Sequence, residues 1–363
     1  MQHLSISTFI TTDSKIYFSS MQFNGLFEMN PNTNKISFVD LFNNVKPLSK
    51  KLHNGCIQYK NYLVFQTTDQ YDCLHVYNLT TCEMGCVALS SGKKQKFLFL
   101  SDESVWVLLF DSVTKKIEIK KIDCDNLSAT DFMKMDISNY FKDSCKIKRV
   151  VADNNGHALF ALSHTNKLFE IDLNEREYSI ISSEVNDIFS VFYTNGICCL
   201  TTYCDKGVFI KNSDNQYDFY KIADSNMNTS DILINRITCW NGRTVAFSAY
   251  DMHCFEINHN EKCLLEINSL NEDDKKEESK YFFNAGYSSI DTYRDQLIYL
   301  SLSLDKCFII KPEETDYRCV YFDFEMTHKN ELCKHQKDEL SATIKTEEKL
   351  FLLDDFLSAI VYG

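Results

Sequence analysis

The chain has 363 residues, of which 44 % are hydrophobic and 13 % aromatic, so it can bury a large core and is not expected to be disordered. Its formal net charge of −13 repels phosphate backbones and anionic lipid surfaces, which disfavours nucleic-acid binding and membrane association. No stretch approaches the roughly 20 apolar residues that span a bilayer, and Met1–Ser7 lacks the features of a secretory signal, so we expect a cytoplasmic protein.

A two-part apolar pattern recurs eight times along the chain. In each copy a short apolar run is followed, after a polar turn, by a second run such as Leu26–Asn30, Leu168–Asp172 or Cys254–Asn258. The first runs are anchored, at a spacing of roughly 40 to 55 residues, on Ile16, Leu63, Val105, Leu159, Ile197, Val245, Leu297 and Leu350. A repeat of this length indicates one supersecondary unit that is copied around or along an axis.

Each repeat is interpreted as four strands. A first strand precedes each anchor, in chain order Phe9–Thr12, Cys56–Tyr59, Phe97–Leu100, Val150–Asp153, Ser190–Tyr193, Ile237–Trp240, Ser289–Thr292 and Ala342–Lys345. The turns between the first and second strands include Asn195-Gly196 and Asn241-Gly242, a strong hairpin signal because both residue types tolerate positive φ. A fourth, more polar strand closes most units, at Lys35–Leu41, Glu83–Leu89, Glu177–Ile181, Tyr217–Ile222, Lys262–Asn268 and Arg318–Phe324.

The character of the strands predicts an all-β fold. The second strands are continuous apolar runs, as expected when neighbouring sheets cover both faces, whereas the fourth strands alternate, as expected near a wet edge. Four-stranded antiparallel sheets packed face to face around an axis form a β-propeller. We therefore predict a single β-propeller domain over residues 1–363, with blades near 9–42, 56–89, 97–137, 147–182, 188–222, 233–268, 287–324 and 340–363 and insertions near 126–145, 271–280 and 326–338.

The number of blades follows less directly from the pattern. Eight anchors favour eight blades, and seven blades are the alternative because the last unit stops without a fourth strand. Met1–Ile6 is a candidate to supply that missing strand, although its connection to Phe9 is short for the distance across a four-stranded blade.

The cysteines do not predict disulfides or a metal site. Their count is 15, which is odd, and many of them occupy strand positions that suit a small hydrophobic side chain, which favours reduced thiols. Cys82 and Cys86 flank a turn and could hold a metal, but Cys86 is interpreted as a packing residue. His328, Cys333 and His335 are zinc-ligand types without a recognisable fourth partner, so we interpret their segment as a polar loop. We predict neither a metal nor a cofactor.

The four-strand unit resembles that of the β-propeller repeat superfamily over the whole chain, and is similar to bacterial quinoprotein-like, kelch-like and WD40-like repeats. The signatures of the subfamilies are missing: neither Trp106 nor Trp240 precedes an aspartate as in WD40 blades, and no Gly-Gly doublet occurs as in kelch blades. The resemblance therefore implies the fold and brings no catalytic residues with it.

The candidate site residues are those that precede or open the innermost strands, where propellers commonly bind their ligands. They are His53, Asn54, Lys96, Arg149, Asp187, Asn235, Arg236, Tyr287, Asp291 and Glu339. Such a ring of charged, polar and aromatic groups could bind a small polar ligand or a peptide through a few directed hydrogen bonds. Four of them, Asp187, Asn235, Asp291 and Glu339, are also residue types that hold a hard cation in metal-dependent hydrolases.

These residues favour a monomeric, non-enzymatic binding or scaffold module that recognises a protein or a small polar ligand through one face of the propeller. The alternative is a hydrolase, lyase or isomerase that acts on a sugar or lactone at the mouth of the central channel, so the sequence leaves catalysis open. In a third interpretation the disc docks into a larger assembly through exposed aromatic side chains such as Phe42, Phe141, Phe282 and Phe283.

Overall fold

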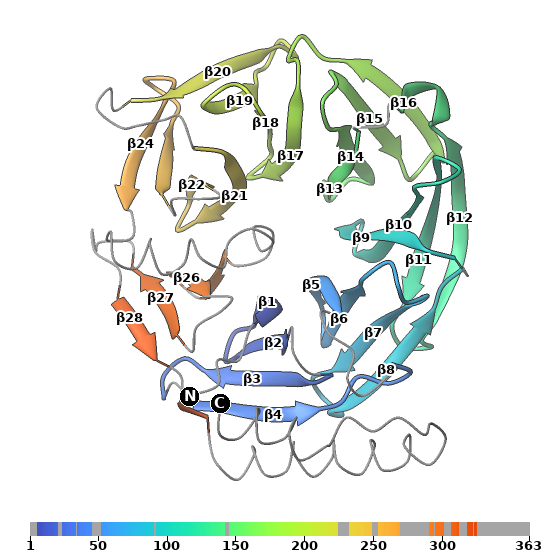
Figure 1. The fold of residues 1–363 in the computed structure, drawn as a ribbon. Helices are drawn as coiled ribbons and strands as arrows, with labels where there is room; N and C mark the ends of the chain where they lie inside the picture. The colour runs from blue at the N-terminus through green and yellow to red at the C-terminus, as the bar shows by residue number, and fades with distance from the viewer. Residues whose placement is uncertain are drawn as a thin grey trace, which may run out of the picture.

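The strands of this protein form a ring of four-stranded antiparallel sheets around a central axis (Figure 1), which confirms the predicted β-propeller. The structure is a computed structural model. It describes residues 6–20, 24–33, 35–45, 52–90, 92–141, 145–223, 232–248, 253–268, 290–293, 295–300, 306–311, 318–321 and 323–324. We number the sheets as blades 1 to 7 in chain order, from β1–β4 to β25–β28.

Each blade is built from four consecutive strands that run from the axis to the rim. The innermost strands are β1 (Ile6–Thr11), β5 (His53–Tyr59), β9 (Lys94–Ser101), β13 (Ile147–Ala152), β17 (Ile188–Thr194), β21 (Ile234–Trp240) and β25 (Ile290–Tyr293). The second strands are β2 (Ile16–Ser20), β6 (Tyr62–Thr67), β10 (Ser104–Asp111), β14 (His157–Leu162), β18 (Ile197–Thr202), β22 (Arg243–Ser248) and β26 (Gln296–Leu300).

The outer half of each blade continues the same antiparallel order. The third strands are β3 (Leu26–Asn30), β7 (Cys73–Asn78), β11 (Lys116–Asp123), β15 (Lys167–Asp172), β19 (Gly207–Lys211), β23 (Cys254–Asn258) and β27 (Lys306–Ile310). The rim strands are β4 (Lys35–Asp40), β8 (Glu83–Ala88), β12 (Ser128–Asp136), β16 (Glu177–Ser182), β20 (Tyr217–Ile222), β24 (Cys263–Asn268) and β28 (Arg318–Tyr321). A short 3-10 helix, η1 (Ser138–Tyr140), follows β12.

The turns between the first two strands of the blades adopt the backbone conformation that their sequences predict. Asn195 and Gly196 have φ values of 50° and 75°, and Asn241 and Gly242 have values of 49° and 75°. Positive φ at both central residues is the requirement of a type I′ hairpin turn, whose twist matches that of the flanking strands. Asn-Gly pairs therefore fix the register of β17 with β18 and of β21 with β22.

The hydrophobic core lies in layers between neighbouring blades, and β10 shows how one strand serves two layers. Successive side chains of a strand point to opposite faces. Trp106, Leu108 and Phe110 accordingly pack in the layer between blades 3 and 4. Val105, Val107 and Leu109 pack in the layer between blades 2 and 3. This two-sided burial explains the continuous apolar runs of the second strands.

The ring of described blades closes between blade 7 and blade 1. The predicted fourth strand Arg318–Phe324 divides there: β28 pairs within blade 7, and β29 (Asp323–Phe324) pairs in parallel with β4 of blade 1. At the inner edge, the hydroxyl of Thr11 donates to the carbonyl of Thr292 over 2.5 Å. The described strands thus form seven blades, and the predicted eighth unit lies outside the described residues.

Several sequence predictions concern residues outside this ring. The unit 340–363, the insertions 271–280 and 326–338, and residues Met1–Ser5 lie outside the described residues, whereas Ile6 opens β1. The two described aromatic residues of the docking hypothesis are packed inward: Phe42 is buried, and Phe141 is half-buried and stacks on Phe110 at a centroid distance of 5.0 Å. Phe42 cannot contribute to an exposed aromatic patch, so the docking hypothesis was wrong for this residue.

The cysteines from Cys56 to Cys263 are all free thiols, and most of them are buried. None of the elements in the described part is a helix of the length and hydropathy that a membrane crossing requires.

Candidate functional site

The candidate residues predicted from the sequence lie at the beginnings of the innermost strands. His53 and Asn54 open β5, Lys96 lies in β9, Arg149 in β13, Asn235 and Arg236 in β21 and Asp291 in β25, while Asp187 directly precedes β17. Tyr287 and Glu339 lie outside the described residues. Asn54 is exposed, Asn235 is buried, and Arg236 is half-buried.

His53 is buried at the junction of blades 1 and 2. Its Nε2 lies 2.8 Å from Nδ1 of His75 on β7, and the ring of Phe42 packs against both imidazoles at centroid distances of 4.3 and 5.0 Å. The Ser7 hydroxyl of β1 donates to the backbone carbonyl of His53 over 2.5 Å. Burial lowers the pKa of His75 to about 4 and the pKa of His53 well below its usual value, so both rings are neutral at physiological pH.

Lys96 is buried and joins blade 3 to blade 2. Its ammonium donates to the backbone carbonyls of Thr68, in the loop between β6 and β7, and of Lys94, over 2.8 and 3.2 Å. Burial lowers the pKa of this ammonium, and the nearby carboxylate of Asp72 opposes the shift. The charge of Lys96 is therefore used for a structural contact rather than directed into the channel.

Asp187 and Arg149 join blades 4 and 5. One carboxylate oxygen of Asp187 lies 3.0 Å from Nδ1 of His164 in blade 4, and the other accepts from the Cys204 thiol over 3.0 Å. This hydrogen bond raises the pKa of Cys204. The Arg149 guanidinium of β13 lies 4.7 Å from the ring centroid of Phe192 on β17. The predicted ring residues with these contacts therefore fasten blades to one another.

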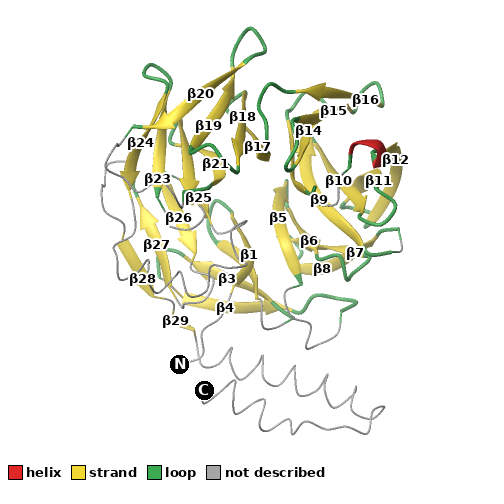
Figure 2. Cartoon of the chain, turned by 45° about the horizontal axis from the view of Figure 1, so that its top comes forward, coloured by secondary structure: helices red, strands yellow, loops and turns green. Residues whose placement is uncertain are grey.

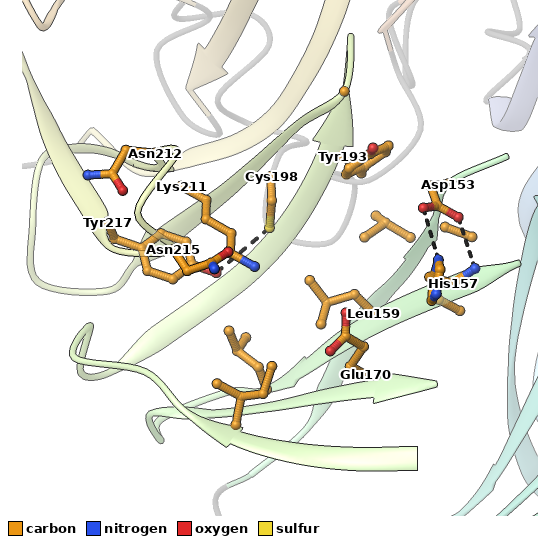
Figure 3. A pocket seen from close by; sticks show the side chains of 16 residues that line it. Asp153, His157, Leu159, Glu170, Tyr193, Cys198, Lys211, Asn212, Asn215 and Tyr217 are labelled. Atoms are coloured by element: carbon orange, nitrogen blue, oxygen red, sulfur yellow. Dashed lines mark hydrogen bonds and ion pairs between the residues drawn. The ribbon is translucent and has the colours of Figure 1, made fainter. Parts of the chain in front are cut away.

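A pocket of about 620 Å³ lies between blades 4 and 5 (Figure 3). Its residues come from the strands and turns at the opposite end of the innermost strands, because Asp153 follows β13 and Tyr193 lies near the end of β17. From blade 4 the lining includes Val151, Ala152, Asp153, His157, Ala158, Leu159, Leu168, Glu170 and Ile181. From blade 5 it includes Tyr193, Gly196, Cys198, Lys211, Asn212, Asn215 and Tyr217.

The floor of this pocket is apolar and rigid. Leu168 and Cys198 belong to the buried cluster between the two blades, and Val151, Leu159 and Tyr217 pack against that cluster. In Figure 3, Leu159 and Glu170 lie on the side of blade 4, and Lys211 and Tyr217 lie on the side of blade 5. An apolar floor with a few polar groups above it is the usual composition of a ligand-binding pocket.

The polar groups of the pocket are fixed by turns. Oδ1 of Asp153 accepts from the backbone N–H groups of Asn155 and His157, both over 2.9 Å. Asn212 likewise accepts from the N–H groups of Asp214 and Gln216 over 3.0 Å. Side chains that bond to their own turn lose little further freedom when a ligand binds, so the pocket is preorganised.

Three groups that line the pocket have shifted pKa values. Burial raises the pKa of Cys198 and the pKa of Tyr217, so both keep their protons, and the two groups hydrogen-bond to each other over 3.8 Å. Burial opposes ionisation of Asp153, but the N–H groups of His157 and Asn155 lower the pKa of its carboxyl, which is therefore ionised. Cys198 is then not a thiolate nucleophile, and Asp153 is not a general acid.

The sequence interpretation missed this pocket because it considered the other end of the innermost strands. The predicted turn Asn195-Gly196 contributes Gly196 to the pocket wall, but the sequence pattern indicates only a hairpin there. Tyr193 and Tyr217 lie at strand ends, but this placement indicates a pocket only when it is known that blades 4 and 5 are neighbours.

Comparisons with known proteins agree with the fold. No family model and no curated protein matches the chain. Among solved structures, a streptogramin B lyase is similar with a TM-score of 0.60 and 11 % identity, covering 84 % of this chain and 92 % of that chain. The virginiamycin B lyase from Staphylococcus aureus has a TM-score of 0.55 and 8 % identity, covering 85 % and 95 % of the two chains.

A WD40 repeat structure is also similar to this chain. The RRP9 WD40 repeats have a TM-score of 0.54 and 9 % identity, covering 86 % of this chain and 88 % of that chain. Identities this low show the fold alone. The chain is a β-propeller, a fold that it shares with both lyases and WD40 repeat proteins.

Proposed function

We propose that this chain is a non-enzymatic binding module that recognises a segment of a protein partner through the pocket between blades 4 and 5. The observation that supports this proposal is the combination of an apolar floor with preorganised polar groups from the turns of two blades. The protonation states of Cys198, Tyr217 and Asp153 suit hydrogen bonding rather than catalysis.

The chemistry of the lining suggests the composition of the segment. Leu159 offers a surface for an apolar side chain, and the carboxylate of Glu170 can pair with a basic one. Tyr193, which is 39 % exposed, offers a ring that can be covered on binding. Because the net charge of the chain is −13, a basic segment is also attracted over a longer range.

The alternative of an enzyme acting on a sugar or lactone at the channel mouth has less support. It needs carboxylates that converge on the axis, and Asp187 is instead paired with His164 and Cys204. The likeness to lyases concerns the fold and does not place a catalytic group in this chain.

A peptide-display selection against the purified protein, followed by affinity measurements by calorimetry, tests the proposal. We expect the enriched peptides to combine an apolar and a basic residue. Tyr193→Ala is expected to weaken their binding at least about 10-fold, or about 1.4 kcal/mol, and Glu170→Lys is expected to disfavour basic peptides selectively. Tyr178→Ala is the matched control, because Tyr178 is 40 % exposed and does not line the pocket.

Two results would contradict the proposal. The first is a selection that enriches no peptide above a blank surface. The second is a set of enriched peptides whose affinity is the same for wild type and Tyr193→Ala but falls for Tyr178→Ala, since the binding surface would then lie at the rim of blade 4.

A further inference from the structure

Three metal-ligand side chains that the proposed binding function does not use meet on the outer half of blade 2. Cys73 and His75 lie on β7, and Cys86 lies on the neighbouring strand β8. Because residues two apart on a strand share a face, Cys73 and His75 point the same way. The register pairs His75 directly with Cys86, which brings the third side chain to the same place.

The three donor atoms are close enough for one ion. The nearest ring nitrogen of His75 and the sulfurs of Cys73 and Cys86 all lie within 4.8 Å of one another, and Cys73 Sγ is 3.8 Å from His75 Nε2. Around a tetrahedral zinc with bonds of about 2.3 Å to sulfur and about 2.0 Å to nitrogen, ligand atoms are separated by roughly 3.5 to 3.8 Å. A contraction of at most about 1.3 Å in any of these distances would bring the three atoms to those separations.

The histidine is oriented as a metal ligand would be. Nδ1 of His75 is bonded to Nε2 of His53 over 2.8 Å, and Nε2 of His75 lies 2.8 Å from the carbonyl oxygen of Asn43. A carbonyl only accepts, so Nε2 of His75 carries the proton and Nδ1 accepts from His53. A metal on Nε2, the nitrogen nearest Cys73, would replace its hydrogen bond to the Asn43 carbonyl, while the His53 contact at Nδ1 holds the ring, as a partner on the other nitrogen commonly does for metal-binding histidines.

We propose that Cys73, His75 and Cys86 form a zinc site, with His53 as the residue that orients the histidine ligand. Zinc binding releases one proton from each thiol, and the proton on Nε2 of His75 moves to Nδ1, where Nε2 of His53 accepts it. The proton of His53 then resides on its own Nδ1. Two thiolates and one imidazole leave a fourth position for water, the pattern of an open zinc site.

The types of ligand favour zinc over other metals, and the site is accessible from the surface. Thiolate and imidazole ligands suit zinc and disfavour magnesium and calcium, which prefer oxygen. Cys86 is half-buried, and the neighbouring Asn43 is exposed, so an ion can reach the site from the surface beside blade 1.

Cobalt substitution tests the site with a visible probe. The full chain, reduced and stripped of metal with a chelator, is titrated with Co²⁺ alone. We expect one Co²⁺ per chain, a thiolate charge-transfer band in the near ultraviolet, and visible bands typical of tetrahedral cobalt, all displaced by one equivalent of Zn²⁺. Cys86→Ser is expected to remove the part of the charge-transfer absorption that comes from the Cys86 thiolate, and to weaken Zn²⁺ binding at least about 100-fold. His53→Leu is expected to weaken Zn²⁺ binding about 10- to 100-fold.

Cys82→Ser is the matched control, because Cys82 is an exposed cysteine in the turn of the same hairpin. The proposal is overturned if wild type binds no Co²⁺, if Cys86→Ser retains the full spectrum, or if Cys82→Ser loses it. X-ray absorption of zinc-loaded wild type decides the case even if a variant fails to fold: two sulfurs at about 2.3 Å support the site, and a shell of nitrogen and oxygen alone refutes it.

Discussion

The side chain of Asn24 makes a reciprocal pair of hydrogen bonds that we expect to be essential for the junction between blades 1 and 2. Its Oδ1 accepts from the backbone N–H of Phe42 over 3.0 Å, and its Nδ2 donates to the carbonyl of the same residue over 3.1 Å. Asn24 and Phe42 are 1 % and 2 % exposed, so water cannot replace these bonds. The bonds hold the chain where Phe42 packs on His53 and His75.

Two substitutions distinguish the contribution of the Asn24 donor from that of its acceptor: Asn24→Ala removes both, and Asn24→Asp removes only the donor. Asn24→Ala leaves both backbone groups of Phe42 buried without a partner, at about 1 to 3 kcal/mol each, so we expect a loss of about 2 to 6 kcal/mol in the free energy of unfolding. Asn24→Asp keeps the acceptor but places a buried carboxylate against the Phe42 carbonyl oxygen, at a cost of about 3 to 5 kcal/mol at pH 7.5.

The pH dependence of Asn24→Asp gives the sharper test. A protonated carboxyl can donate to the Phe42 carbonyl, so folding raises the pKa of the introduced group. The folded variant then binds a proton that the unfolded chain lacks until the pH approaches about 3.9. Its deficit relative to wild type should therefore shrink by about 1.4 kcal/mol per pH unit below the raised pKa.

Guanidinium unfolding followed by tryptophan fluorescence at pH 7.5, 6.0 and 5.0 measures this deficit, because Trp106 and Trp240 are both buried. Asn186→Asp is the control, since it adds the same charge at an exposed position. A deficit below about 1 kcal/mol at pH 7.5, or one that stays constant or grows toward pH 5.0, would refute the reasoning about unpaired buried groups.

Three further predictions concern other parts of the ring. A Cβ at Gly207 would clash with the backbone carbonyl oxygen of Tyr220, so Gly207→Ala should lower the free energy of unfolding by about 1 to 3 kcal/mol. Gly55→Ala should cost less, because a Cβ there would lie 3.4 Å from the Gln66 side chain, which is an ordinary contact distance. Equal denaturant midpoints for the two variants would show that this packing argument is wrong. The backbone N–H groups of Thr114 and Val113 lower the pKa of Asp111, so the stabilisation from its carboxylate is present above pH 3.8 and is lost as the pH falls through the lowered pKa. Asp111→Ala should therefore lower the free energy of unfolding by about 1 kcal/mol at pH 7 and have the same stability as wild type in strong acid. A stability difference that widens in acid would contradict this prediction. The indole N–H of Trp240 donates to the Asp295 carbonyl over 2.7 Å. Trp240→Phe removes this donor, so we expect a loss of about 1 to 3 kcal/mol in the free energy of unfolding and a lower melting temperature. An unchanged melting temperature in calorimetry would exclude a contribution from this hydrogen bond.

The repeat pattern was sufficient to predict the fold because the strands of each blade can be recognised from the apolar runs and turns within that blade's own sequence. The apolar runs at Ile16, Leu63 and Val105 open or lie within second strands, and Asn195-Gly196 forms the expected turn. The blade count was harder to predict, because it depends on where Asp323 and Phe324 pair, and that pairing joins residues far apart in sequence.

The candidate site was less predictable for a physical reason. His53, Lys96 and Asp187 do lie at the beginnings of innermost strands, but a charged or polar residue there can face the channel or bridge two blades. The sequence does not distinguish these outcomes, because the partners, Thr68 and His164 among them, belong to other blades. The Cys73–His75–Cys86 cluster was missed for a related reason: Cys86 was compared with Cys82 along the chain rather than with His75 across the hairpin.

The closure between blades 7 and 1 has a consequence for assembly. Every other pair of adjacent blades is tied by the polypeptide itself, whereas within the described residues this pair is joined by contacts such as Thr11 with Thr292 and the two-residue ladder of β29 with β4 (Figure 2). Because β1–β4 and β25–β28 are each one stretch of chain, parting this junction would release only β29 from the sheet of blade 1 and open the circle into an arc. Two such arcs expose matching ends, and at high concentration they can join into an exchanged dimer.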